Sequence, residues 1–186
     1  MMRKNFGVKS YFYPLPVLMI ATYDEEGRAD CMNAAWGGLY DANQVILCLS
    51  ASHKTTKNIH LKKAFTVSFA DAKHVAEADY LGLVSGNQVH DKLEKANLHV
   101  TKSEFVEDPL IDEFPLTLEC RYIKDTEDGN IIGEIVNVSA DESILGEDGK
   151  IDVNRLEAIS FDPSHNTYVK VQGHIGNAFQ DGNAFK

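Results

Sequence analysis

Residues 116–139 read LTLECRYIKDTEDGNIIGEIVNVS, and this stretch indicates more about the fold than any other part of the sequence. Apolar and polar side chains alternate from Leu116 to Tyr122, which is the period of a half-buried β-strand. Residues 125–130 then supply the acids, Gly and Asn of a turn, and the run from Ile131 to Ser139 returns. The stretch therefore predicts an antiparallel β-hairpin.

Shorter segments on both sides of this hairpin predict further strands and a few helices. The other predicted strands are residues 17–22, 28–33, 45–49, 65–69 and 168–171. The predicted helices are residues 52–61, 72–83, 90–97 and 151–159. Ser52 or Thr55 is the expected N-cap of the first of these helices. Short strands with a few helices between them, and no regular βαβ alternation, predict a mainly β (α+β) fold, an antiparallel barrel or sandwich with helical insertions.

The composition is that of an ordinary globular chain. With 186 residues, 44% of them hydrophobic and 25% charged, we expect one domain over residues 1–186. No apolar run approaches the roughly 20 residues needed to cross a bilayer, and no secretory leader is expected. The net charge of −10 would repel a phosphate backbone or an anionic membrane, so neither nucleic acid nor a membrane is an expected partner.

The cysteines and histidines give no sign of a metal site. Cys31, Cys48 and Cys120 are widely spaced and lie in apolar or alternating segments, so we expect buried, reduced thiols and a cytoplasmic protein, with a redox pair or a metal site as the alternative. None of the seven histidines pairs with another at metal-ligand spacing. We therefore expect no bound metal.

One part of this acidic chain is cationic. Residues 42–70 contain no Asp or Glu, yet they hold Lys54, Lys57, Lys62 and Lys63. Such a local excess of positive charge favours an anionic small ligand. A solvated basic helix face without a ligand is the alternative that charge alone leaves open.

Two motifs stand out in a chain without the GxxxxGK[ST], GxGxxG, GxSxG or HExxH signatures. Residues 32–38, MNAAWGG, combine an amide, small residues and Trp36, which would let a planar ligand approach the backbone; a hairpin corner with a core Trp is the alternative. Residues 50–56, SASHKTT, place hydroxyls and a cation at a helix start, which is a combination that binds phosphate.

The order of these segments resembles the flavin reductase-like, FMN-binding split β-barrel family, particularly its flavoredoxin-type members. NAAWGG, SASHKTTKNI, the FTVSFA strand and the GLVSG turn carry the resemblance, which extends from about Pro14 to Ser139. It implies a split antiparallel β-barrel with Greek-key connections and a homodimer that binds FMN between its subunits. The FMN-binding residues that the resemblance implies are Asn33, Ala34, Ala35, Trp36, Ser50, Ser52, His53, Lys54, Thr55, Thr56 and Ser85.

The chain departs from the family pattern at three places. Lys54 stands where family members often have Arg, which replaces a bidentate fork with a point charge. The turn from Ser85 to Leu93 is one residue longer than the common SGRDVDKF, and the C-terminal His segment of NAD(P)H:flavin reductases is not clear. This last departure bears on nicotinamide oxidation more than on FMN binding.

The residues and the resemblance agree on function. FMN performs redox chemistry in its own ring, so the lack of a catalytic acid, base or nucleophile motif is expected. We therefore expect an FMN-dependent oxidoreductase or electron carrier working between a small-molecule or protein donor and an acceptor. The alternatives are an NAD(P)H-dependent flavin reductase that uses FMN as substrate, and a non-catalytic flavin-binding sensor module.

Overall fold

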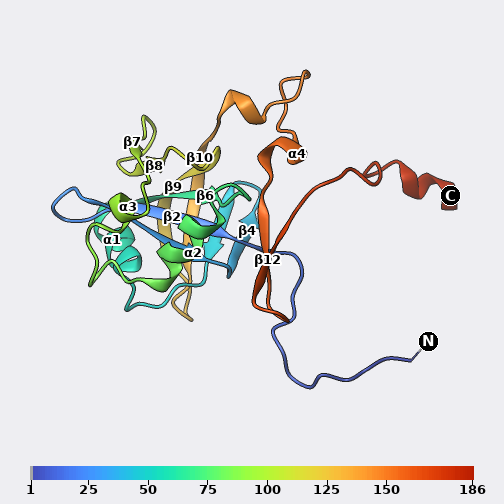
Figure 1. Ribbon diagram of the computed structural model, residues 1–186, viewed down its shortest axis with the longest axis horizontal. Helices are drawn as coiled ribbons and strands as arrows, with labels where there is room; N and C mark the ends of the chain where they lie inside the picture. Colours follow the sequence, from blue (N-terminus) through green and yellow to red (C-terminus); the bar gives the residue numbers. More distant parts are fainter. Residues whose placement is uncertain (1) are drawn as a thin grey trace.

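An antiparallel sheet of seven strands forms the centre of the computed structural model, which describes residues 2–186 (Figure 1). In their spatial order the strands are β3 (Ala29–Ala34), β2 (Leu18–Tyr23), β6 (Ala64–Phe69), β9 (Leu116–Asp125), β10 (Ile131–Ala140), β5 (Gln44–Leu47) and β4 (Gly37–Asp41). The order β6-β9-β10-β5 places an early strand beside the last of three later ones, which is a Greek-key arrangement. The predicted mainly β, antiparallel fold is confirmed.

The predicted hairpin of residues 116–139 is the β9–β10 pair, in which Leu118 lies opposite Val138. The register shifts next to Gly133, which lies opposite Tyr122. A Cβ atom built on Gly133 would come within 2.3 Å of the Phe65 ring, so glycine is required for this buried ring to lie against the strand. The local bulge therefore follows from the packing of the core.

Both faces of the sheet are buried against apolar clusters. One cluster contains Ile20, Phe65 and Ile131 and includes Ile59 of helix α1 (Lys54–Lys62); the other contains Met19 and Leu81, the latter from helix α2 (Val75–Leu83). Because both faces are covered, the strand at residues 65–69 cannot have a solvent-facing side, and this part of the prediction is wrong.

The strand at residues 65–69 was expected to be half-buried, but its hydroxyl face is buried as well. Thr66 donates a hydrogen bond to the Pro109 carbonyl at 2.6 Å, and the hydroxyls of Ser68 and Thr117 are 2.8 Å apart. The segment around β7 (Val100–Lys102) and β8 (Pro109–Ile111) covers this face, so these hydroxyls form hydrogen bonds within the protein instead of with water.

The remaining elements are short. They are β1 (Leu15–Pro16), β11 (Ile159–Asp162) and β12 (Thr167–Lys170), which form a three-stranded sheet, together with α3 (Lys92–Lys95), η1 (Glu142–Ile144), α4 (Val153–Leu156) and η2 (Asp181–Phe185). The helix expected over residues 151–159 is therefore only one turn long, because Ile159 begins a strand. Cys31 and Cys120 are buried as expected, but the prediction for Cys48 is wrong because its side chain is exposed.

Both ends of the chain extend away from the sheets (Figure 1). Every residue from 2 to 14 and from 171 to 186 is exposed. Within residues 2–186 no helix is both long and apolar enough to span a membrane.

Asp108, beside β8, is a buried carboxyl group with one unpaired oxygen. Its Oδ1 accepts a hydrogen bond from the Tyr23 amide at 2.5 Å, while its Oδ2 has no partner among the described residues. Burial raises the pKa of Asp108 to about 7, although the Tyr23 amide and Lys62 oppose the shift. An ordinary Asp has a pKa of about 3.9 in an unfolded chain. The native state therefore binds the proton more tightly than the unfolded state does.

We expect Asp108→Asn to flatten the dependence of stability on pH. Because the folded pKa lies above the unfolded one, the contribution of Asp108 is fully present below about pH 4 and is lost as the pH rises through 7. The variant should be more stable than the wild type at pH 8, by at most about 4 kcal/mol. Urea unfolding at pH 5 and pH 8 measures this, with the exposed Asp112→Asn as control. Parallel pH profiles for wild type and Asp108→Asn would contradict the prediction.

Candidate functional site

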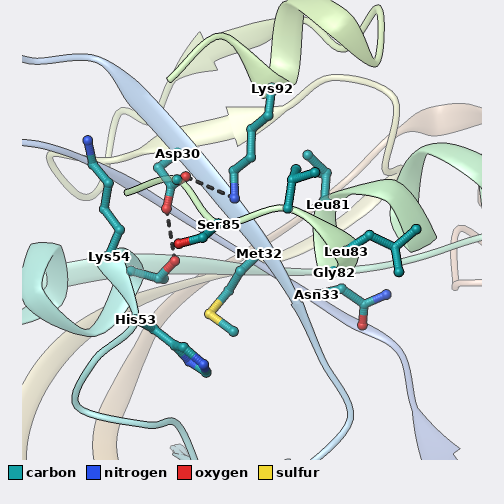
Figure 2. Close-up of a pocket in the computed structure, with 13 residues that line it drawn as sticks. Asp30, Met32, Asn33, His53, Lys54, Leu81, Gly82, Leu83, Ser85 and Lys92 are labelled. Carbon is teal, nitrogen blue, oxygen red and sulfur yellow. Dashed lines mark hydrogen bonds and ion pairs between the residues drawn. The ribbon is translucent and has the colours of Figure 1, made fainter. Parts of the chain in front are cut away.

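A cavity of about 200 Å³ lies between β3, the N-terminus of α1 and the segment that follows α2 (Figure 2). Its walls bring together five residues that the sequence singled out. They are Asn33, His53, Lys54, Thr55 and Ser85. Residues from three separate parts of the chain, including both motifs and the GLVSG turn, therefore meet at one place, as the sequence pattern predicts for a common site.

A second cavity of about 270 Å³ lies beside the first. It is lined by Ala34 and Ala35 together with Tyr168 of β12, and it shares Asn33, Gly82 and Leu83 with the first cavity. Cofactor pockets usually measure roughly 300–1,000 Å³, a range that neither cavity reaches alone but both reach together. The two cavities are adjacent, and we call them together the recess; the first has the more polar lining and forms its polar end, and the second forms its more apolar end.

Trp36, Ser50, Ser52 and Thr56 do not line either cavity. The Trp36 side chain is 61% exposed at the corner before β4, so the alternative of a core Trp is wrong. The Ser50 and Ser52 hydroxyls are 2.8 Å apart, and the Thr56 hydroxyl donates to the Ser50 carbonyl at 2.8 Å. Whether these four residues contact a ligand stays a prediction.

The N-terminus of α1 forms one wall of the first cavity. The N-cap residue is His53, and its side chain makes no capping hydrogen bond, so the expectation of Ser52 or Thr55 as the cap is wrong. The amides of the first turn of a helix have no acceptors within the helix and carry the positive end of its dipole. The His53 Nδ1 atom is also buried without a partner among the described residues. This helix end, with its unsatisfied polar groups, lies beside the cavity, which His53 and Thr55 help to line.

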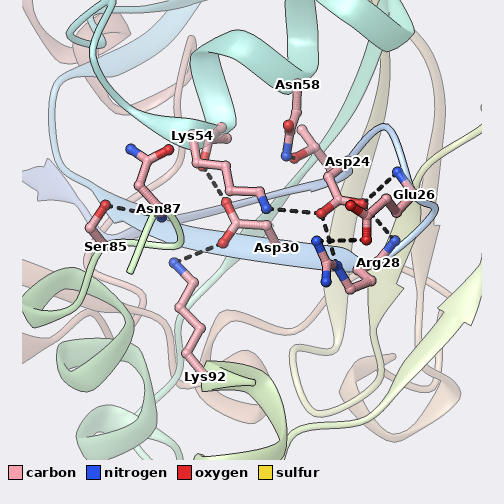
Figure 3. Close-up of polar contacts among 11 residues, drawn as sticks. Asp24, Glu26, Arg28, Asp30, Lys54, Asn58, Ser85, Asn87 and Lys92 are labelled. Carbon is pink, nitrogen blue, oxygen red and sulfur yellow. Dashed lines mark hydrogen bonds and ion pairs between the residues drawn. The ribbon is translucent and has the colours of Figure 1, made fainter. Parts of the chain in front are cut away.

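Lys54 already has a partner, the buried carboxylate of Asp24 (Figure 3). The Nζ atom lies 2.8 Å from Asp24 Oδ2, and Arg28 contacts the same carboxylate. Although burial acts in the opposite direction, hydrogen bonds from Lys54 and Arg28 hold the pKa of Asp24 well below its usual value. The cation expected to bind phosphate is therefore fixed at the helix start by an ion pair.

A second ion pair, which the sequence analysis missed, lies at the floor of the first cavity (Figure 2). Lys92 Nζ is 3.0 Å from Asp30 Oδ1, and the Thr55 hydroxyl donates to Asp30 Oδ2 at 2.9 Å. Both charged residues are buried, and an added Cβ on Gly86 would lie 2.2 Å from Asp30 Oδ1. Lys92 belongs to the charged run 90–97, so only its burial in the fold distinguishes it from the surface lysines around it.

The apolar end of the recess is held in place by hydrogen bonds around β3. The Asn33 amide donates to the Ala78 carbonyl at 3.0 Å, and a Cβ on Gly82 would approach Asn33 Cβ to 3.2 Å. Tyr168 donates to Asp79 at 2.7 Å, and burial together with this carboxylate raises the pKa of Tyr168 to about 12. The phenol therefore stays protonated at neutral pH, and the wall carries no phenolate charge.

The recess fits an anionic group at one end and a flat apolar group at the other. Within the part of the chain that the structure describes, no three His, Cys, Asp or Glu residues are grouped so that they could hold a metal ion. Helix amides and cations suit an anion, while Ala34, Ala35 and Leu83 offer small and apolar contacts.

Comparison with known proteins gives the same fold and a family. The chain matches the family described as "Flavin reductase like domain" over residues 10–156. Its structure is similar to flavoredoxin of Desulfovibrio vulgaris (Miyazaki F), with 33% identity, a TM-score of 0.94 and coverage of 97% of this chain and 100% of that chain. Flavoredoxin from Methanosarcina acetivorans is 28% identical, with a TM-score of 0.86 and coverage of 100% and 99%.

A more distant structure shares the fold alone. A putative flavin reductase with a split barrel domain from Shewanella frigidimarina is 17% identical, with a TM-score of 0.76 and coverage of 89% of this chain and 86% of that one. The split-barrel fold expected from the sequence is thus confirmed. The resemblance to flavin reductase-like and flavoredoxin proteins is confirmed as well.

Proposed function

The chain belongs to the flavin reductase like domain family, and on that premise we propose that it is an FMN-binding flavoprotein acting as an oxidoreductase or electron carrier. Membership of this family, together with the flavoredoxin neighbours, supports a flavin-related oxidoreductase or electron-carrier role in general. FMN as the particular flavin, and its retention as a bound cofactor, form the proposal.

The observation that carries the proposal is the start of α1 beside the recess. The free amides of the first turn are donors that a phosphate oxygen would satisfy, and His53, whose Nδ1 has no partner among the described residues, lies beside them. Lys54 adds a positive charge at the same helix end. FMN carries a phosphate that riboflavin lacks, so these groups favour FMN over riboflavin.

The apolar end would hold the flavin ring. Ala34 and Ala35 have side chains small enough for a flat ring to approach the backbone, and Leu83 offers an apolar contact beside them. When bound, FMN supplies hydride and one-electron chemistry through its ring system. The chain itself positions the ring, and the buried ion pair of Lys92 and Asp30 places an oriented dipole at the floor of the first cavity. No catalytic side chain is required.

An absorption spectrum of the purified protein tests the proposal. We expect flavin absorbance that survives desalting and an extracted chromophore that has the mass of FMN. Loss of the chromophore on desalting, together with NADH or NADPH consumption when free FMN is added, would assign the chain as a flavin reductase with FMN as substrate. Bound flavin that no reductant turns over would assign it as a sensor module.

We also propose that the protein is a homodimer, because β4 is an unprotected edge strand. It is the last strand of the seven-stranded sheet, and its Leu39 and Tyr40 side chains are 73% and 53% exposed. Exposed apolar edge strands invite pairing unless another chain covers them. Sedimentation should give about 41 kDa, twice the chain mass of 20.7 kDa. A monomer of about 21 kDa with full FMN occupancy would contradict the proposal.

A further inference from the structure

The two ends of the chain form arms that extend away from the body of the protein (Figure 1). We call residues 2–12 and 174–186 the terminal arms. Each of their residues is exposed, and Ile175, Phe179 and Phe185 of the C-terminal arm are almost completely so. The hydrogen bonds of the described residues of the arms, such as that from the Asn177 amide to Asp181 at 2.9 Å, stay within one arm. Large apolar side chains are thus held where their own chain offers no cover.

The arms follow the same path in a solved relative. The TM-score against the Desulfovibrio vulgaris flavoredoxin is 0.94 with 97% of this chain covered. In a TM-score each residue contributes at most an equal share of a total of 1. The arms make up more than a tenth of the chain, so a comparison in which neither arm matched would score below 0.9. A value of 0.94 could not be reached if both arms took different courses in the two proteins. The extended arms are therefore a shared feature of the fold.

An extended arm needs a contact to keep one path. Ordering each residue costs roughly 1–2 kcal/mol of conformational entropy, which the solvent-exposed arm does not recover from its own chain. A shared path therefore indicates that another molecule covers the arms.

Charge favours a second copy of this chain as that molecule. Residues 1–23 hold Arg3, Lys4 and Lys9 and no acids, a balance of +3. Because the whole chain carries −10, residues 24–186 carry −13. The N-terminal arm is thus complementary to the acidic body that each copy presents to the other.

We propose that the terminal arms clasp the partner subunit of the homodimer. The C-terminal arm buries Ile175 and Phe179 against the second copy, and the N-terminal arm places its cations on the acidic surface of that copy. This rests on the homodimer proposed above and names the segments that hold it together. Because every residue of the terminal arms is exposed, changing them should weaken the dimer without unfolding the subunit.

Sedimentation of the full-length protein over a range of concentrations tests this. The double variant Ile175→Asp/Phe179→Asp should raise the dimer dissociation constant by at least about a hundredfold, because it replaces two buried apolar side chains with charged ones. The variant Arg3→Glu/Lys4→Glu should also weaken the dimer and reduce its dependence on salt. The matched control is Val100→Asp/Phe105→Asp, which changes two exposed apolar residues of the body. This control should keep the wild-type dissociation constant.

Thermal unfolding and the flavin spectrum separate the possible outcomes. The melting curve of the C-terminal variant, compared at a concentration where both proteins are monomeric, should match that of the wild type. An unchanged dissociation constant in this variant, or an unfolded variant, would overturn the role of the arms. If the protein binds flavin and the C-terminal variant is still a dimer, the proposed role of the arms is refuted and the flavoprotein proposal stands. If the protein binds no flavin and the C-terminal variant dissociates the dimer, the proposed role of the arms stands and the flavoprotein proposal is refuted.

Discussion

Replacing Ala34 with Leu is expected to lower the affinity for FMN by at least about a hundredfold while the protein still folds. Ala34 ends β3 opposite Leu18 and lines the apolar cavity together with Ala35. A leucine side chain there would occupy the space that the flavin ring needs. Overpacking costs folded proteins only ~1–3 kcal/mol, because neighbouring groups adjust, whereas a rigid flat ring cannot adjust. Fluorescence titration of FMN measures the change.

Riboflavin should lose affinity to the same extent, because the steric overlap concerns the ring and not the phosphate. Ala35→Leu is the second test variant, since Ala35 lies between β3 and β4 and has no strand partner. Ala42→Leu, in the exposed turn between β4 and β5, is the control and should bind both flavins normally. Unchanged flavin affinity in folded variants of both Ala34 and Ala35 would place the ring elsewhere.

Six of the seven strands of the central sheet were predictable because their signals are local, whereas β4, and the short strands β1, β7 and β8, were not predicted. The period-two alternation of residues 116–122 and the turn at 125–130 fix the β9–β10 hairpin without reference to any other part of the chain. The same holds for the acidic turn between β2 and β3. The alternation of apolar and polar residues does not indicate which other segments cover a strand. The burial of Thr66 and Ser68 is therefore seen only in the structure.

The sequence indicated seven of the residues that line the two cavities but not the ion pairs beside them. Its two motifs are short and unusual in composition, so sequence alone selected them. Lys54 pairs with Asp24, 30 residues earlier in the chain, and Lys92 pairs with Asp30 across a still longer separation. Such pairs depend on how β3, α1 and α3 pack. No periodic pattern in the sequence indicates these pairs. A run of charged residues on a short helix ordinarily indicates a solvated face.

Lys54→Ala is expected to weaken FMN binding by roughly ten- to a hundredfold and to leave riboflavin binding nearly unchanged. A charge-assisted contact contributes ~1.5–3 kcal/mol, and only FMN has the phosphate to make it. The substitution also leaves the buried Asp24 carboxylate without its lysine, which adds repulsion toward a phosphate at the same helix end. Lys57, Lys62 and Lys63 lie further along α1 or just after it and do not line the recess. Alanine at any of these three should change the free energy of binding by at most ~1 kcal/mol.

The double variant Asp24→Asn/Lys54→Ala separates a direct contact from an indirect one. It removes both charges of the pair, so no buried carboxylate is left without a counter-ion. If Lys54 contacts the phosphate, the double variant should still bind FMN at least about tenfold more weakly than wild type, with riboflavin as reference. Recovery of wild-type affinity would mean that Lys54 acts only by neutralising Asp24 and that the helix amides and His53 hold the phosphate. Equal losses for FMN and riboflavin would mean instead that the phosphate does not bind at this end of α1, because the effect would then come from the ring or from the fold.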